Sequence, residues 1–187
     1  QQKLDDTRWL IWFTEMNIKK ITNTALMFTI TRLIEIFGIA TLLLGLLLLT
    51  SLITYSPDDP NFIFSKDIEI KNLLGIHGSY VSDLFFQSVG LISYLISISF
   101  IFTGINIFIS KDFFLIIENI FFIILYCIFG SIFFNFFYDS NLALYINGNG
   151  GFVGQYLNES FFKDLIVLNE NISYYFFYIL ILILFLI

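Results

Sequence analysis

The residues of this chain that could do chemistry are few and scattered. His77 is the only histidine, and it lies in a glycine-flanked loop with no cysteine beside it, so we predict an exposed loop residue rather than a metal ligand. Asp58 and Asp59 are adjacent, but two neighbouring carboxylates fall far short of a calcium site. The glycine-rich turn at 147–151 is not followed by the Gly-Lys-Ser/Thr of a phosphate-binding loop. The sequence therefore predicts no catalytic, metal-binding or cofactor-binding residue in this chain.

Glu118 is the carboxylate that most invites a functional role, because it lies near the start of a long apolar run. It is next to Asn119, near Lys111, and close to the end of that run. We favour a side chain that reaches the membrane interface over a proton or ion site. A small transporter or channel module that uses Glu118 is the alternative function.

The composition places the chain in a membrane. Its 187 residues are 58% hydrophobic and 13% charged, against about 45–50% apolar and about 25% charged in soluble domains. The net charge of −6 argues against direct nucleic-acid binding by this segment, because such surfaces gather lysine and arginine. The lipid bilayer is thus the first predicted partner.

The apolar runs predict an all-α integral membrane protein with four transmembrane helices. The spans are expected at about 33–54, 84–109, 113–137 and 172–187, the last of them truncated. Residues 1–31 form a separate cytoplasmic segment before the membrane domain of 32–187. Residues 1–24 of that segment fit either an amphipathic helix on the membrane surface or a frayed tail. Because the chain begins with Gln and stops inside an apolar run, we expect a fragment of a longer protein.

Lysine and arginine set the expected orientation. If the N-terminus is inside, six of the nine basic residues are cytoplasmic, as the positive-inside rule requires. We therefore predict N-in and C-in topology with both long loops outside. The first loop begins at Tyr55, and Pro57, Asp58 and Pro60 must end the incoming helix there.

Small residues in the second predicted span recur at helical spacing. Such a stripe is where helices approach closely in lipid. Its members are Gly90, Ser93, Ser97 and Gly104.

The two outer loops contain an apparent internal repeat. Residues 75–86 align with residues 151–162 at a constant offset, with two glycines, a tyrosine, a carboxylate and a Phe pair in common. Chance similarity between aromatic-rich stretches is the alternative. Each copy predicts a short amphipathic helix before an even-numbered span, and in the first copy Tyr80, Val81 and Phe85 would form its apolar face.

These loop motifs resemble the N-terminal four-helix membrane domain of the FtsK/SpoIIIE DNA translocases. The similarity covers about residues 30–187 and includes the segment Tyr-Ser-Pro-x-Asp-Pro, a downstream Gly-x-x-Gly, and Gly-Gly-x-x-Gly before the last span. Ser79 and Ser82 depart from the alanines common in that family. The motif residues, which the resemblance marks for partner contact, are Tyr55, Ser56, Pro57, Asp58, Pro60, Gly75, Gly78, Asp83, Gly151 and Gly154.

The resemblance implies a non-enzymatic anchor in the bacterial inner membrane, at the division septum. Such an anchor tethers a motor that pumps DNA during chromosome segregation and cytokinesis. It would contact other divisome membrane proteins and self-associate, as a hexamer by family resemblance. No Walker A sequence occurs in these residues, so ATP and magnesium are expected only in a motor domain outside this chain.

Overall fold

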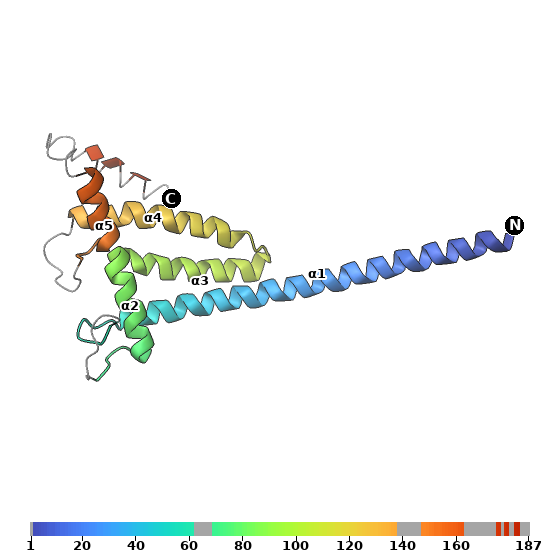
Figure 1. The fold of residues 1–187 in the computed structure, drawn as a ribbon, viewed down its shortest axis with the longest axis horizontal. Helices are drawn as coiled ribbons and strands as arrows, with labels where there is room; N and C mark the ends of the chain where they lie inside the picture. Colours follow the sequence, from blue (N-terminus) through green and yellow to red (C-terminus); the bar gives the residue numbers. More distant parts are fainter. Residues whose placement is uncertain are drawn as a thin grey trace.

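The computed structural model describes residues 2–61, 69–137 and 147–162, and a few positions between 175 and 183. The described elements are α1 (Gln2–Ile53), α2 (Gly75–Val89), the 3-10 turn η1 (Gly90–Ile92), α3 (Ser93–Ser110), α4 (Leu115–Phe137), α5 (Gly151–Leu157) and the π-helical turn η2 (Asn158–Phe162). Helices α1, α3 and α4 run lengthwise, whereas α2 and α5 lie across the end of the bundle where α1 and α4 finish (Figure 1). The predicted fourth span, 172–187, lies almost wholly outside the described residues.

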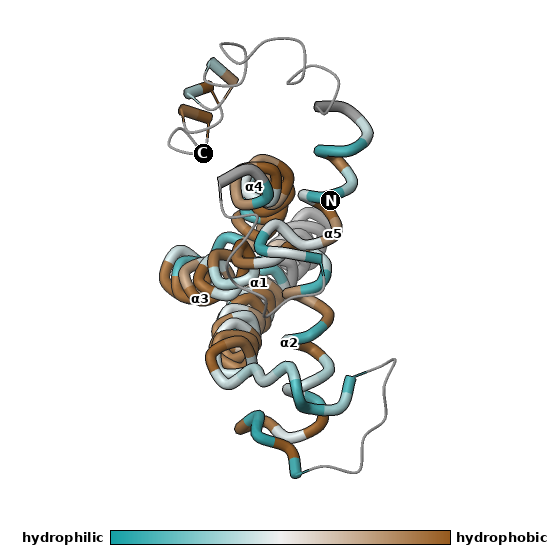
Figure 2. Tube along the Cα trace, turned by 90° about the vertical axis from the view of Figure 1, so that its left-hand side faces the viewer, coloured by the Kyte–Doolittle hydropathy of each residue, from teal (hydrophilic) through white to brown (hydrophobic). Residues whose placement is uncertain are grey.

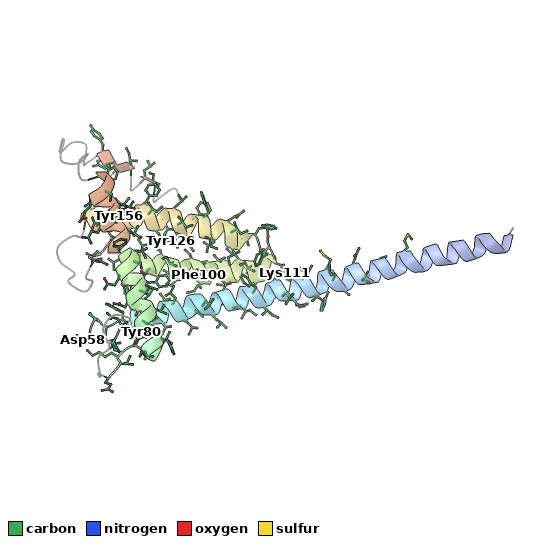
Figure 3. The ribbon with its side chains drawn as sticks, in the orientation of Figure 1. Asp58, Tyr80, Phe100, Lys111, Tyr126 and Tyr156 are labelled. Atoms are coloured by element: carbon green, nitrogen blue, oxygen red, sulfur yellow. The ribbon has the colours of Figure 1, made fainter. Side chains whose placement is uncertain are left out.

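Among the described residues, three helical stretches are long and apolar enough to cross a membrane: Thr22–Ile53, Gly75–Ser110 and Leu115–Asn135. This confirms the prediction of an all-helical membrane protein. Seen from the end that carries α2 and α5, hydrophilic residues recur in these two helices and in the chain next to α2, whereas the lengthwise helices behind them are mostly hydrophobic (Figure 2). Lys111 lies at the opposite end from Asp58, Tyr80 and Tyr156 (Figure 3).

Helix α1 is longer than the first predicted span of 33–54. It continues without a break from Gln2 through the expected boundary at residues 31 and 32. No glycine or proline occurs before Gly38, so nothing in the sequence interrupts the backbone hydrogen bonds there. The helix ends at Ile53, just before the Tyr55–Pro60 segment, as predicted.

The second predicted span, 84–109, requires a correction. A turn at Gly90 divides it, because this glycine adopts φ +64° and ψ −139° and ends α2. Residues 84–89 therefore belong to the crossing helix α2, and the lengthwise helix begins at Ser93. The 18 residues of α3 extend about 27 Å, close to the thickness of the hydrocarbon core.

Helices α1 and α3 pack backbone against backbone through glycines. A Cβ added at Gly38 would lie 2.9 Å from Phe108 N, and one at Gly104 would lie 2.7 Å from Gly38 O. Seven residues further along α1, a Cβ at Gly45 would lie 2.8 Å from Ile101 N. Gly104 was in the predicted small-residue stripe. Gly38 and Gly45 were not, although their seven-residue spacing is a signal of one helical face.

The buried core lies where α1, α2 and α3 meet beneath the crossing helix. Phe86 of α2 is fully buried there, and its ring contacts those of Tyr55 and Tyr94 at centroid distances of 4.9 and 5.5 Å. The buried cluster consists of Leu48, Leu52, Phe86, Ile92 and Ile96. The crossing helix α2 thus contributes a buried side chain, Phe86, to the core.

The opposite end of the bundle is held by charge. Lys111 ends α3 in the left-handed conformation, with φ +60°, and turns the chain into α4. Its Nζ lies 2.9 Å from Oε1 of Glu35 on α1, and Arg32 pairs with the other carboxylate oxygen. Glu35 therefore ties the α3–α4 turn to α1.

We predict that Gly104→Val loosens the α1–α3 pair. The added atoms would meet the backbone of α1, which cannot move aside like a flexible side chain, so the cost should be about 1–3 kcal/mol. Ile105→Val, at an exposed neighbouring position, is the matched control and should change stability little. Denaturant unfolding of the two variants in detergent micelles measures the difference, and equal stability would show that the glycine contact is not tight.

Candidate functional site

The motif residues of the first loop and of α2 converge at one end of the bundle, in a structure that we call the cap, whereas Gly151 and Gly154 lie in α5. It consists of residues 54–61, residues 69–74 and helix α2. The incoming chain from α1 and the chain entering α2 meet here. The cap is therefore the candidate site that the sequence motifs build.

Asp59 is the centre of the cap. It is 4% exposed, and its carboxylate accepts the backbone N–H of Lys71 at 3.0 Å and of Asn72 at 2.9 Å. Hydrogen bonds from N–H groups to a carboxylate are strong, and they compensate the burial of its charge. Asp59 thus fixes the segment before α2 against the end of α1.

Asn72 and Ser51 connect the segment before α2 to the end of α1. The Asn72 side chain donates to Ser51 O at 2.9 Å and accepts from Leu74 N at 3.0 Å. Ser51 Oγ donates to Gly78 O at 2.6 Å. Gly78 has no room for a side chain, because an added Cβ would lie 2.6 Å from Leu74 Cβ. Helix α2 therefore lies directly on the end of α1.

The far side of the cap is closed by α2 itself. Ser79 Oγ donates to Pro60 O at 2.6 Å, and Tyr55 Oη donates to Asp83 Oδ1 at 3.1 Å. These bonds join both ends of the Tyr55–Pro60 segment to one helix. Hydrogen bonds within the molecule thus involve most of the motif residues of the cap, among them Tyr55, Ser56, Pro60, Gly75, Gly78 and Asp83.

The face that α2 buries is not the apolar face predicted from the sequence. Tyr80, Val81 and Phe85 were expected to share one apolar face of an amphipathic helix; Val81 is exposed, and Tyr80 and Phe85 are half-buried. The buried residues of α2 are Gly78, Ser79, Ser82 and Phe86. Small side chains suit this face because the backbone of α2 comes so close to α1, and Ser82 satisfies its hydroxyl by donating to Gly78 O at 2.8 Å.

An exposed rim surrounds the buried part of the cap. Pro57 and Asp58 are exposed, and Ser56 is half-buried beside them. Lys71 Nζ lies 2.9 Å from Asp58 Oδ2. The hydrogen bond from Lys71 to this carboxylate, with its charge, raises the pKa of Lys71 above the usual value. Among the motif residues of the cap, Pro57 and Asp58 on this rim are the ones that are exposed.

The structure reproduces the geometry of the sequence repeat. Helices α2 and α5 begin at Gly75 and Gly151, with φ of +64° and +62°. Each of these glycines donates its N–H to the carbonyl three residues earlier, at 2.9 Å to Asn72 O and 3.2 Å to Gly148 O. Gly154 lies against Ser131 of α4, where an added Cβ would be 2.9 Å from the Ser131 carbonyl carbon, much as Gly78 meets Ser51 of α1. We call α1 and α2 the first half, and α4 and α5 the second half. The second half thus repeats the arrangement of the first, a long helix followed by a short crossing helix.

The two halves interlock at Gly90. Leu91 N donates to Asn149 O at 2.9 Å, and a Cβ at Gly90 would lie 2.6 Å from the Asn149 carbonyl carbon. From the same turn, Val89 O accepts Ser131 Oγ at 3.2 Å. Gly90 therefore lies at the contact between the halves, whereas Gly104 lies at the contact between α1 and α3. The hydroxyls of Ser93 and Ser97 donate to carbonyls three residues earlier, those of Gly90 and Tyr94. The predicted stripe is divided between two contacts.

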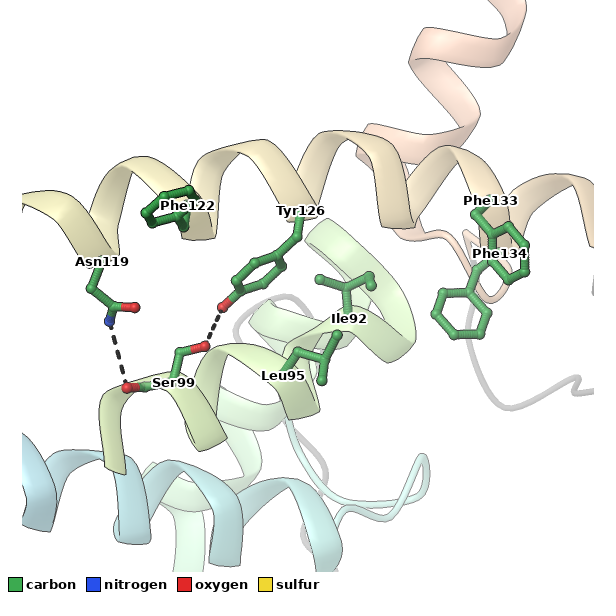
Figure 4. A pocket seen from close by; sticks show the side chains of 8 residues that line it. All are labelled: Ile92, Leu95, Ser99, Asn119, Phe122, Tyr126, Phe133 and Phe134. Carbon is green, nitrogen blue, oxygen red and sulfur yellow. Dashed lines mark hydrogen bonds between the residues drawn. The ribbon is translucent and has the colours of Figure 1, made fainter. Parts of the chain in front are cut away.

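A groove of about 540 Å³ lies between α3 and α4 (Figure 4). Within it, Tyr126 Oη donates to Ser99 Oγ at 2.9 Å, and Asn119 Nδ2 approaches Ser99 O at 3.5 Å. Such polar contacts hold helices together in lipid, and we did not predict them from the sequence. Glu118, one residue from Asn119, is exposed in the first turn of α4, where a negative charge is favourable.

No group of three histidine, cysteine, aspartate or glutamate side chains that could hold a metal ion occurs among the described residues. The site is therefore a polar, internally bonded cap on a helical membrane bundle. The class of protein that it defines is a membrane protein with short crossing helices at one end of its spans.

Comparison with known proteins identifies the family. Residues 31–187 match the family described as the 4TM region of DNA translocase FtsK/SpoIIIE, and the chain belongs to that family. It is 36% identical to the DNA translocase FtsK of Azospirillum brasilense over 73 residues, and this alignment covers 38% of this chain and 12% of that protein. It is 38% identical to the DNA translocase FtsK of Rickettsia bellii (strain RML369-C) over 64 residues, and this alignment covers 34% of this chain and 8% of that protein.

The chain thus matches only a small part of the length of these relatives. The matched family region is the membrane region and not the motor. No solved structure is significantly similar to the chain.

We predict that Asp59→Asn weakens the cap and Asp58→Asn does not. The amide of an asparagine at position 59 would place an NH2 group where a carboxylate oxygen now accepts a backbone N–H. One of the two hydrogen bonds would be lost, which should lower the free energy of unfolding by about 1–3 kcal/mol. Position 58 is exposed, with one salt bridge at its surface, so its variant should unfold close to the parent. Urea unfolding of both variants in micelles tests this, and equal midpoints would contradict the central role of Asp59.

A second pair of variants tests the contact between the halves. Gly75→Ala and Gly90→Ala both place alanine at a φ of +64°, but Gly90 combines this φ with a ψ of −139°, a conformation almost confined to glycine, so its backbone strain is the larger of the two. Only the Cβ at Gly90 would meet backbone, whereas at Gly75 no described atom lies within 4 Å. The Gly90 variant should therefore lose clearly more stability, as measured by thermal unfolding. Equal losses would mean that the halves are not in close contact.

Proposed function

We propose that this chain is the membrane anchor and division-site interaction domain of a DNA translocase that serves chromosome segregation and cytokinesis. The observation that carries this proposal is the match of residues 31–187 to the membrane region of the FtsK/SpoIIIE family. The relatives that it matches are themselves named DNA translocases. Its place in the cell would be the bacterial inner membrane at the septum.

The chemistry of the chain supports an anchor. Between Glu35 and Asp58, and throughout α3, the sequence carries no charged residue. Glu118 is exposed at the first turn of α4 and does not lie midway along a helix. Ion and substrate pathways need such groups inside the bundle, so this arrangement favours anchoring over transport.

The proposed partners follow from the same features. The exposed rim of the cap, with Pro57, Asp58 and Lys71, would meet other divisome membrane proteins. Self-association is also proposed, as a hexamer by family resemblance. DNA, ATP and magnesium would be handled by a motor outside this chain, because the net charge of −6 disfavours a nucleic-acid surface here.

Septal recruitment tests the anchor directly. The chain fused to a fluorescent protein should collect at the septum of dividing bacteria, and Glu118→Gln should collect equally well. In proteoliposomes neither protein should conduct ions above the background of empty vesicles. A uniform membrane distribution would contradict the division-site role, and an ion flux that Glu118→Gln abolishes would establish transport instead.

A further inference from the structure

The groove between α3 and α4 combines an apolar wall with a small group of polar side chains (Figure 4). Aliphatic and aromatic residues such as Ile92 and Phe122 form most of the wall, and Ser99, Asn119 and Tyr126 form its polar part. A concave, mostly apolar space of about 300–1,000 Å³ with a few convergent polar groups is the usual form of a small-molecule site. The groove, at about 540 Å³, has this form.

The polar part of the groove lies at membrane depth. Ser99 follows the start of α3 at Ser93 by about 9 Å along the helix, and Tyr126 lies near the middle of α4. Both belong to stretches that are long and apolar enough to cross a membrane. Because the bilayer core offers no water as a partner, an unused donor or acceptor is costly here.

The hydroxyl of Ser99 keeps a hydrogen that no described residue accepts. Three other serines of α3 donate their hydroxyl hydrogens to backbone carbonyls, namely Ser93, Ser97 and Ser110. Ser99 Oγ instead accepts the hydrogen of Tyr126 Oη at 2.9 Å and donates to no acceptor within the described chain. The hydrogen of Ser99 is therefore available to a molecule in the groove.

Asn119 offers the complementary group on the other helix. Its side chain points from α4 toward Ser99 (Figure 4), with Nδ2 at 3.5 Å from Ser99 O. Its Oδ1 accepts no hydrogen bond from any described residue. The groove thus presents one donor and one acceptor side by side, and none of the described residues that line it is charged.

We propose that the groove binds a lipid-soluble alcohol, a molecule with one neutral hydroxyl group on an apolar body. The hydroxyl oxygen would accept from Ser99 Oγ, and its hydrogen would be donated to Asn119 Oδ1. The hydrocarbon chain of a phospholipid would fill the space but leave both groups unused, and a charged headgroup would find no opposite charge in the wall. The inference goes beyond the proposed anchor and does not rest on it.

A pair of matched probes tests the role of the hydroxyl. The chain in phospholipid vesicles is irradiated with a hexadecanol that carries a diazirine in its alkyl chain, or with the methyl ether of the same compound. The alcohol should label the groove segments of α3 and α4 about tenfold more than the ether, the effect of one hydrogen bond of typical strength. Equal labelling by the two probes, or no labelling of these segments because a helix fills the groove, would overturn the proposal.

Variants test which side chains hold the hydroxyl. Asn119→Leu removes the acceptor at similar side-chain size, and Ser99→Ala removes the donor on the other helix, so each should lower labelling by the alcohol to about the level of the ether. Asn106→Leu, at an exposed position of α3 outside the groove, is the control and should be labelled like the parent. Unchanged labelling of Asn119→Leu and Ser99→Ala, or an equal loss in Asn106→Leu, would refute the assignment of these two groups.

Discussion

The described first half of the molecule depends on a buried carboxylate that holds the backbone of a loop. Asp59 follows the point where α1 stops, and its two oxygens accept N–H groups of Lys71 and Asn72 just before α2 starts. A carboxylate at 4% exposure is costly unless its hydrogen bonds are complete. Because completing them requires these two backbone groups in place, the direction in which α2 leaves the loop is fixed with them.

From that fixed start, glycine determines how closely the helices approach. Gly78 lets α2 lie on the end of α1, and Gly90 lets the end of α2 meet the turn before α5. The same solution appears in the second half, where Gly154 lies on Ser131 of α4. Without a hydrophobic force between helices in lipid, close packing and polar contacts are what remain to hold them together. The glycines supply the packing, and Ser51, Ser99 and Tyr126 supply the contacts.

Much of this architecture was predictable because the responsible residues are local. Pro57 and Asp58 predicted the end of α1, and the paired motifs at 75–86 and 151–162 predicted two short helices that the described residues contain. The turn at Gly90 was missed because an isolated glycine in an apolar run is equally compatible with a packed helix. Its cause is a contact with Asn149, 59 positions away, which no local pattern reveals. The inward face of α2 was missed for a related reason, since serine is buried there only because its hydroxyl finds the carbonyl of Gly78.

The distribution of polar contacts says what kind of work the fold suits. At one end, Asp59, Asn72 and Ser51 lock loop, crossing helix and span together; at the other, Glu35 ties Lys111 of the α3–α4 turn to α1. Between these ends, the described helices meet through glycines, aliphatic side chains and neutral hydrogen bonds. In the described helices the charged contacts lie at the two ends, whereas an ion pathway places charged groups inside a bundle. A bundle held in this way at both ends suits the proposed role of an anchor, which has to present a fixed surface on each side of a membrane.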